Sequence, residues 1–120
     1  MAVGDIVWHD LTIDDATEVR DFYKTVIGWE HDDHSMGDYN DYVLHPAGGS
    51  NTAVGVCHRR GPNAGMPAQW MIYVQVEDVA ESCKRAVHEG GDVIEGPRDM
   101  GGKAFAVIRD PAGAVLAIIE

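Results

Sequence analysis

The sequence predicts an α+β fold made of two tandem βαβββ units. The main observation is an internal repeat, because residues 11–30 match residues 74–93 at an offset of 63 positions, which takes Leu11 to Val74. A second match, at an offset of 65, takes Val43 to Ile108 and aligns the two turns that follow. Strand-like and helix-like patterns also follow one another in the same order in both halves. Such a repeat indicates a half-domain used twice.

The first half begins with a strand and a helix. Residues 5–13 are rich in β-branched and aromatic residues, which predicts a strand. Residues 14–27 carry a helical stripe of apolar residues from Ala16 to Ile27. Asp15 and Glu18 have the spacing of a capping box, and Gly28 is expected to end the helix in the left-handed conformation. Three further strands are expected at residues 29–34, 38–45 and 52–58.

The second half repeats this order. Residues 69–76 predict a strand, and Asp78 with Glu81 repeats the capping box at the start of a helix. Further strands are expected at residues 92–95, 103–109 and 114–120. Residues 59–67 hold two Gly and two Pro without an apolar period, which predicts a linker. The expected organisation is one domain, 1–120, with a first unit at 1–58, the linker at 59–67 and a second unit at 68–120.

Composition narrows the possible partners. Acidic residues outnumber basic ones by 20 to 9, and the formal net charge of −11 disfavours nucleic acid and anionic membranes as partners. The chain has no apolar run long enough to span a membrane and no signal-peptide pattern at its start, so a cytoplasmic protein is expected. Cys57 and Cys83 are the only cysteines, and we interpret them as small buried residues with reduced thiols.

The motifs, taken in order, resemble those of the vicinal oxygen chelate superfamily (glyoxalase / bleomycin-resistance protein / extradiol dioxygenase). The resemblance covers nearly the whole chain. It implies a curved mixed sheet with helices on its outer face, a small-molecule ligand on the concave face, and a homodimer. It also implies a divalent metal in the enzymes of the family, held by His, Glu or Gln on the first and last strands of each unit. The residues that carry it are 14–15 (DD), 22–29 (FYKTVIGW), 76–80 (VEDVA), 90–91 (GG) and 110–113 (DPAG).

The positions that the resemblance assigns to metal ligands lack ligand side chains. The first-strand position is Trp8, fourteen residues before Phe22, and its repeat equivalent is Met71. The last-strand position, seven residues after Asp110, is Ala117. An indole or a methyl group cannot bind these metals, and a thioether is too soft for them. We therefore expect no metal cofactor, with a divalent metal as the alternative. The fourth position stays open among Ala53, Val54, Gly55 and Val56.

Other potential ligands do not repair this site. His9 would need a one-residue slip, which moves a side chain to the opposite face of the strand, and Glu120 has the same fault. His31 and His34 are expected on opposite faces of one strand. The remaining histidines are interpreted as structural: His58 and His88 as isolated surface residues, and His45 as a residue that caps the turn after it.

Strand alternation predicts a ligand-binding face that is mostly apolar and aromatic, as small-molecule sites usually are. Asp10 is the candidate catalytic residue, because a carboxylate beside Trp8 and Tyr73 is placed to act as an acid or base. The alternative is that Asp10 only accepts hydrogen bonds from Tyr73 or from the backbone. The expected members of this face are Trp8, Asp10, Met71, Tyr73, Phe105, Val107, Val115 and Ala117.

Three classes of function fit these expectations. The favoured one is a glyoxalase-like protein that binds a small apolar or aromatic molecule without a metal. The second is a lyase, isomerase or dioxygenase that uses Asp10 or a metal ion. The third is a subunit whose concave face is filled by its own side chains.

Overall fold

The structure, a computed structural model, describes residues 2–120 and divides them into two compact bodies. The α1 body is His9–Trp70. The α2 body consists of the residues up to Trp8 together with Met71–Glu120. Strand β1 (Ile6–Ile13) contributes to both bodies.

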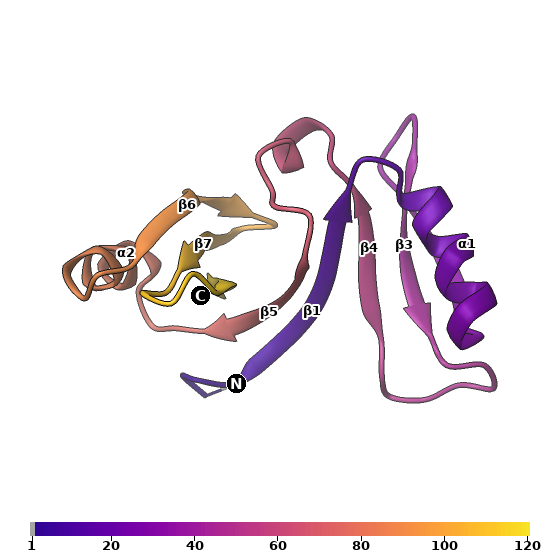
Figure 1. The fold of residues 1–120 in the computed structure, drawn as a ribbon, viewed down its shortest axis with the longest axis horizontal. Helices are drawn as coiled ribbons and strands as arrows, with labels where there is room; N and C mark the ends of the chain where they lie inside the picture. The colour runs from indigo at the N-terminus through magenta and orange to yellow at the C-terminus, as the bar shows by residue number, and fades with distance from the viewer. Residues whose placement is uncertain (1) are drawn as a thin grey trace. The chain divides into compact units, whose positions relative to one another are not determined.

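The α1 body is a four-stranded sheet covered by one helix. After β1 the chain forms helix α1 (Ala16–Ile27), strands β2 (Glu30–Ser35), β3 (Asn40–His45) and β4 (Val54–His58), and a short 3₁₀ helix, η1 (Gly61–Asn63). The strand order is β2-β3-β4-β1. Strands β1 and β4 are parallel and the other pairs are antiparallel. Helix α1 packs against β3 and β4 (Figure 1).

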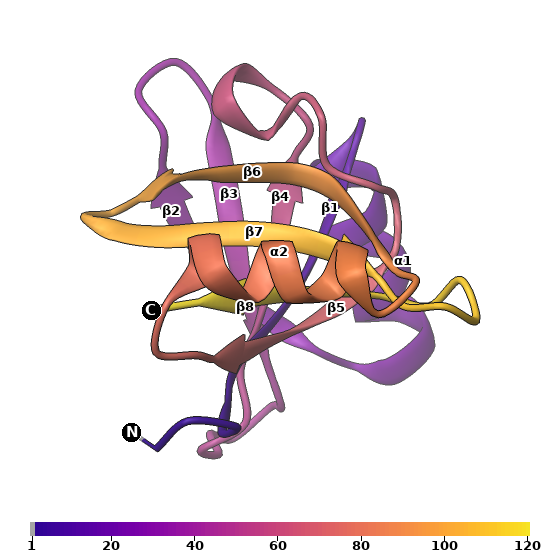
Figure 2. The ribbon, with the colours of Figure 1, turned by 90° about the vertical axis from the view of Figure 1, so that its left-hand side faces the viewer.

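The α2 body repeats this arrangement. Its elements are β5 (Trp70–Gln75), helix α2 (Val79–His88), β6 (Asp92–Met100), β7 (Lys103–Arg109) and β8 (Val115–Ile119). The order β5-β8-β7-β6 mirrors that of the α1 body, again with one parallel pair, β5 with β8. Helix α2 packs against β6 and β7 (Figure 2). The predicted α+β fold with two βαβββ units is therefore confirmed.

Both helices begin with the predicted caps. Asp15 Oδ1 accepts a hydrogen bond from the Glu18 amide at 3.0 Å, and Asp78 Oδ1 accepts one from the Glu81 amide at 3.0 Å. Each carboxylate satisfies an amide that would otherwise lack a partner in the first helical turn. Gly28 ends α1 at a φ of 86°, in the left-handed region that glycine adopts at little cost. These ends of the helices were predictable because the interactions are local.

The apolar stripe of α1 is only partly buried. Ala16 is fully buried against the sheet, and Val19 and Tyr23 pack at the edge of the same core. Phe22, Val26 and Ile27, which belong to the same predicted stripe, are more than half exposed. Helix α2 buries Val79 and Cys83 against its own sheet, as expected.

Strand β6 is longer than predicted. The sequence indicated a short strand at 92–95, but the strand continues past a break in its pairing with β7 as far as Met100. Gly96 permits this path, because its φ is 84° and a Cβ atom there would lie 2.7 Å from the Phe105 carbonyl oxygen. The added length carries Arg98 into the sheet, opposite Phe105.

Strand pairing shows which positions of the two repeats are equivalent. The offset of 63 takes Asp10 to Tyr73. Asp10 pairs with Gly55 between β1 and β4, and Tyr73 pairs with Ala117 between β5 and β8. Gly55 and Ala117 therefore hold the same position in their repeats.

The third strands of the repeats are related by an offset of 64, not 65. Val43 pairs with Gly55 and Val107 pairs with Ala117, so Val43 and Val107 are equivalent. The turns still match at 65, because Asp110 adds one residue between β7 and its turn. The difference matters, since a shift of one residue moves a side chain to the opposite face of the sheet.

Candidate functional site

Each body has one sheet face that packs under its helix and one that does not. The core of the α1 body includes Tyr42, Leu44 and Val56, which face α1. Alternation places the neighbouring residues of these strands on the opposite side, which we call the α1-body helix-free face. In the α2 body the core includes Ala106 and Ile118, so the residues that alternate with them form the α2-body helix-free face.

The α1-body helix-free face is polar. Asp10, Thr12 and Asp41 lie on it, and these are the buried polar or charged residues found among residues 2–120. Cys57 pairs with Thr12 on the neighbouring strand and lies on the same face. The Cys57 thiol is hydrogen-bonded to the Asp41 carboxylate. This body therefore presents two carboxylates around one thiol.

Burial and charge together keep the Cys57 thiol protonated. Removal from solvent is the largest cause that raises the pKa of Cys57, followed by the negative charges of Asp10 and Asp41. The pKa consequently lies far above that of an ordinary cysteine, and the group serves as a hydrogen-bond donor rather than a nucleophile. Both cysteines were expected to be buried, but Cys57 is only partly buried whereas Cys83 is buried. The two carboxylates beside Cys57 were not foreseen.

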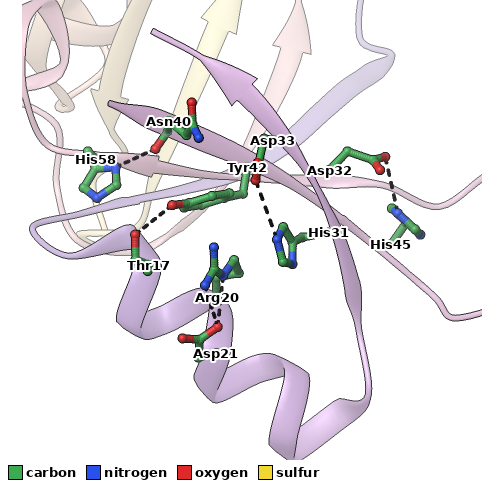
Figure 3. A network of polar contacts seen from close by, with 10 residues as sticks. All are labelled: Thr17, Arg20, Asp21, His31, Asp32, Asp33, Asn40, Tyr42, His45 and His58. Atoms are coloured by element: carbon green, nitrogen blue, oxygen red, sulfur yellow. Dashed lines mark hydrogen bonds and ion pairs between the residues drawn. The ribbon is translucent and has the colours of Figure 1, made fainter. Parts of the chain in front are cut away.

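His58 is part of this polar cluster, so its interpretation as an isolated surface residue was wrong. Its amide donates to Asp41 Oδ1 at 2.8 Å, and its Nδ1 lies 3.5 Å from the same oxygen. The ring nitrogen also contacts the Asn40 carbonyl at 2.9 Å (Figure 3). Asp41 thus holds the ends of β3 and β4 together through the residue that follows Cys57.

The α2-body helix-free face is apolar at the equivalent positions. Tyr73 and Phe105 stack with ring centroids 5.9 Å apart and an interplanar angle of 16°. They occupy the positions of Asp10 and Asp41, respectively, in the other repeat. The remaining predicted members of this face, Met71, Val107 and Ala117, are buried as well.

Arg98 is the cation of this apolar face. Its guanidinium carbon lies 4.7 Å from the centre of the Phe105 ring, a cation–π arrangement. Its Nε lies 3.2 Å from Glu95 Oε1, and both side chains are mostly buried. Arg98 was not predicted for this face, because the strand expected from the sequence ended at Glu95, before the break at Gly96.

A family model described as Glyoxalase/Bleomycin resistance protein/Dioxygenase superfamily matches residues 5–118. The chain belongs to this superfamily. "Putative glyoxylase CFP32" of Mycobacterium tuberculosis is 30% identical over 118 residues, which cover 98% of this chain and 44% of that protein. "Anthracycline biosynthesis protein DnrV" of Streptomyces peucetius is 33% identical over 129 residues, which cover 98% of this chain and 47% of that protein. The chain spans less than half the length of these superfamily relatives.

Solved structures of the superfamily share the fold. A glyoxalase/bleomycin resistance protein/dioxygenase superfamily member from Vibrio splendidus has a TM-score of 0.57 at 13% identity, covering 93% of this chain and 95% of that chain. Methylmalonyl-CoA epimerase from Mycobacterium tuberculosis has a TM-score of 0.56 at 15% identity, covering 100% of this chain and 91% of that chain. At such low identity the likeness establishes the fold and not the activity.

The superfamily's metal positions can now be completed. The pairing of Asp10 with Gly55 and of Tyr73 with Ala117 makes Gly55 the repeat equivalent of Ala117, which identifies the fourth position that the sequence left open. The four residues are Trp8, Gly55, Met71 and Ala117. None supplies the oxygen or imidazole donor that such a metal needs, so this donor set does not fit the metal of the superfamily's enzymes. Within residues 2–120, no three His, Cys, Asp or Glu side chains are grouped to hold a metal ion elsewhere.

The other histidines near β2 and β3 make separate contacts. His31 lies 3.6 Å from Asp33 and meets the edge of Tyr42 on the α1 side of the sheet, where Tyr42 also contacts Thr17 and Arg20 (Figure 3). His45, which was expected to cap the turn after it, contacts a carbonyl of that turn, because its Nδ1 lies 3.1 Å from the Pro46 oxygen. Its Nε2 lies 3.3 Å from Asp32.

Glu120 and a surface cavity lie near the start of α2. Glu120 Oε2 accepts the Val79 amide at 2.9 Å, so this carboxylate serves as a second cap of the helix. A cavity of about 520 Å³ adjoins the same turn and contains none of the predicted site residues. The cavity is lined by Val3, Val76, Glu77, Asp78, Glu81, Ser82 and Arg85.

No helix among residues 2–120 is long and apolar enough to cross a membrane.

The environment of Cys57 predicts a specific change in its reactivity. Replacing Asp41 by Asn removes a negative charge, which lowers the pKa of the thiol and should raise its alkylation rate at mildly alkaline pH by roughly 3–10-fold. Burial remains, so the rate should stay below that of the urea-unfolded chain. Iodoacetamide labelling read by peptide mass spectrometry checks this. The matched control is Asp38→Asn, an exposed carboxylate near Arg60, and equal rates in the two variants would contradict the assignment.

Proposed function

We propose that this protein binds a small apolar or aromatic molecule at its helix-free faces, without a metal ion. The carrying observation is the stacked pair Tyr73 and Phe105 with the Arg98 guanidinium over the Phe105 ring. A guanidinium held over a buried aromatic pair suits an aromatic ligand, because a guanidinium also favours the face of a ligand ring. The predicted ligand-binding residues are Trp8, Asp10, Met71, Tyr73, Phe105, Val107 and Ala117.

Accessibility divides these residues into a floor and a rim. Tyr73, Phe105 and their apolar neighbours are at most 2% exposed, so they support a ligand rather than meet solvent. Trp8 and Arg98 are only partly buried, and they are the side chains that an arriving ligand can reach. The proposed binding therefore depends on the rim for contact and on the floor for shape.

The comparisons favour a role in small-molecule chemistry. One superfamily relative is named for anthracycline biosynthesis, and another is named as a glyoxylase. We propose that this chain also binds a small molecule. We further propose that it is a cytoplasmic homodimer and that neither nucleic acid nor a membrane is its partner. The metal-free part of the proposal is supported by the side chains at the four ligand positions, Trp8, Gly55, Met71 and Ala117, none of which is a suitable ligand.

A second candidate is an enzyme of the lyase, isomerase or dioxygenase type in which Asp10 acts as acid or base. The observation that favours it is the burial of Asp10 on a face that also holds Asp41 and Cys57. Two carboxylates in one buried cluster are a common arrangement for proton transfer.

The binding proposal predicts a selective effect of Arg98. An anthracycline used as an aromatic probe should quench tryptophan fluorescence, and Arg98→Gln should weaken its affinity by roughly tenfold because the cation over the aromatic floor is lost. Arg109→Gln is the matched control, since Arg109 lies 3.9 Å from Asp92 at the end of β7 away from the stacked rings. Equal affinities in both variants, or no binding by the unmodified protein, would refute the proposal.

Whether the protein alters the anthracycline chemically distinguishes a binding protein from an enzyme. Incubation of the anthracycline with the protein in D₂O should return the compound with unchanged mass, because a binding protein forms and breaks no bonds. Mass spectrometry of the recovered compound checks this. Deuterium uptake or conversion that disappears in Asp10→Asn would instead support the enzyme, and Asp14→Asn, an exposed carboxylate paired with Arg59, is the control.

The metal-free part of the proposal is tested by thermal unfolding. A metal present at about 100 times its Kd would stabilise the folded state by about 2.7 kcal/mol, which corresponds to several degrees in a domain of this size. We expect Ni²⁺, Co²⁺, Mn²⁺ and Fe²⁺ to shift the Tm by less than about 1 °C on that scale. A shift of several degrees that EDTA reverses would show that a metal site has been overlooked.

A further inference from the structure

The outer side of α1 carries an apolar surface that nothing in its body covers. We call it the α1 apolar patch, and its exposed members are Phe22, Val26, Ile27 and Trp70, with exposures of 57%, 62%, 54% and 39%. Tyr23 joins them, because its hydroxyl accepts a hydrogen bond from Trp70 Nε1 at 3.0 Å and its ring meets both Phe22 and Trp70. Half of the exposed large hydrophobic residues in the described chain belong to this patch.

The side chains of the α1 apolar patch form one continuous surface. Phe22 and Val26 are four residues apart, as are Tyr23 and Ile27, so they form two adjacent ridges on one side of the helix. Trp70 extends the surface beyond the helix and is held by its bond to Tyr23. Trp29 braces the cluster from below, with its ring centroid 5.6 Å from that of Tyr23 and 6.2 Å from that of Trp70.

The size of the patch matches one side of a small protein interface. The four exposed side chains leave on the order of 400 Å² of apolar surface, which is the size of the largest apolar patch on a typical monomer, and such patches are often functional. A stable interface buries about 800 Å² per partner, of which roughly 65% is apolar in homodimers. The patch would therefore supply most of the apolar centre of such an interface, with polar side chains around it.

We propose that the α1 apolar patch is the surface through which two copies of this chain associate. Two-fold symmetry places the same patch on both partners, so apolar ridges meet apolar ridges without any further partner. This assignment of the interface depends on the homodimer that is part of the proposed function.

Charge opposes this association and provides a signature for it. Each copy has a formal net charge of −11, so two copies repel one another at long range. Salt screens that repulsion, but salt does not weaken the stabilisation gained by burying the apolar ridges. The dimer should therefore tighten as NaCl is raised, whereas association with a basic partner would weaken.

Sedimentation velocity over low-micromolar to submillimolar protein tests the proposal. The unmodified chain should show a reversible monomer–dimer equilibrium that shifts toward dimer in high salt. Val26→Glu should raise the dimer Kd by roughly 100-fold or more, because it buries a charge at the centre of both halves of the interface. Glutamate is at least as good a helix former as valine, so circular dichroism should show α1 intact.

The matched control is Val87→Glu, which places the same charge on an exposed valine of α2, 57% exposed and outside the patch. It should leave the dimer Kd within about twofold of the unmodified protein, as expected for a surface site that is not part of the α1 apolar patch. If the protein dimerises and Val26→Glu does not weaken the dimer, the α1 apolar patch is not the interface, although the homodimer itself is supported. A chain that stays monomeric at every concentration and salt would overturn both.

Discussion

Hydrogen-bonded pairing between the first and last strands of each repeat sets the side-chain positions of the whole molecule. Once Asp10 lies opposite Gly55 and Tyr73 lies opposite Ala117, alternation decides which residues of every neighbouring strand pack under a helix. The helix sides then bury apolar residues against α1 and α2. The helix-free faces receive everything else, including each residue that we assign to ligand binding. A shift of one residue in either pairing would exchange core and site.

The two repeats use the same backbone positions for opposite chemistry. Where one repeat has Asp10 and Asp41 beside a thiol, the other has the stacked rings of Tyr73 and Phe105. Buried carboxylates require hydrogen bonds, and Asp41 accepts them from the Cys57 thiol and the His58 amide. Stacked rings require only close packing. A duplicated scaffold can therefore place a polar site in one body and an aromatic one in the other without a change of fold.

Local signals were readable from the sequence and distant ones were not. The caps at Asp15 and Asp78 involve residues three positions apart, so spacing alone predicted them. The contact of Asp41 with His58 joins residues 17 positions apart on different strands, and no periodic pattern marks it. Arg98 was missed because Gly96 and Pro97 resemble the end of a strand, whereas the backbone continues through them. The outward half of the α1 stripe was missed because helical spacing does not say what the far end of a helix packs against.

The sequence by itself determined the repeat, the order of the elements and the superfamily. It also determined that Trp8, Met71 and Ala117 stand at positions that the resemblance assigns to metal ligands. These depend on residue type and spacing, which are properties of the chain. The tertiary structure decided that Gly55 is the fourth position, that Asp41 shares a buried cluster with Cys57, and that Arg98 lies over Phe105. Each of these depends on which strands become neighbours and in which register. That choice is made by hydrogen bonding and burial across the sheet, between residues that the sequence keeps far apart.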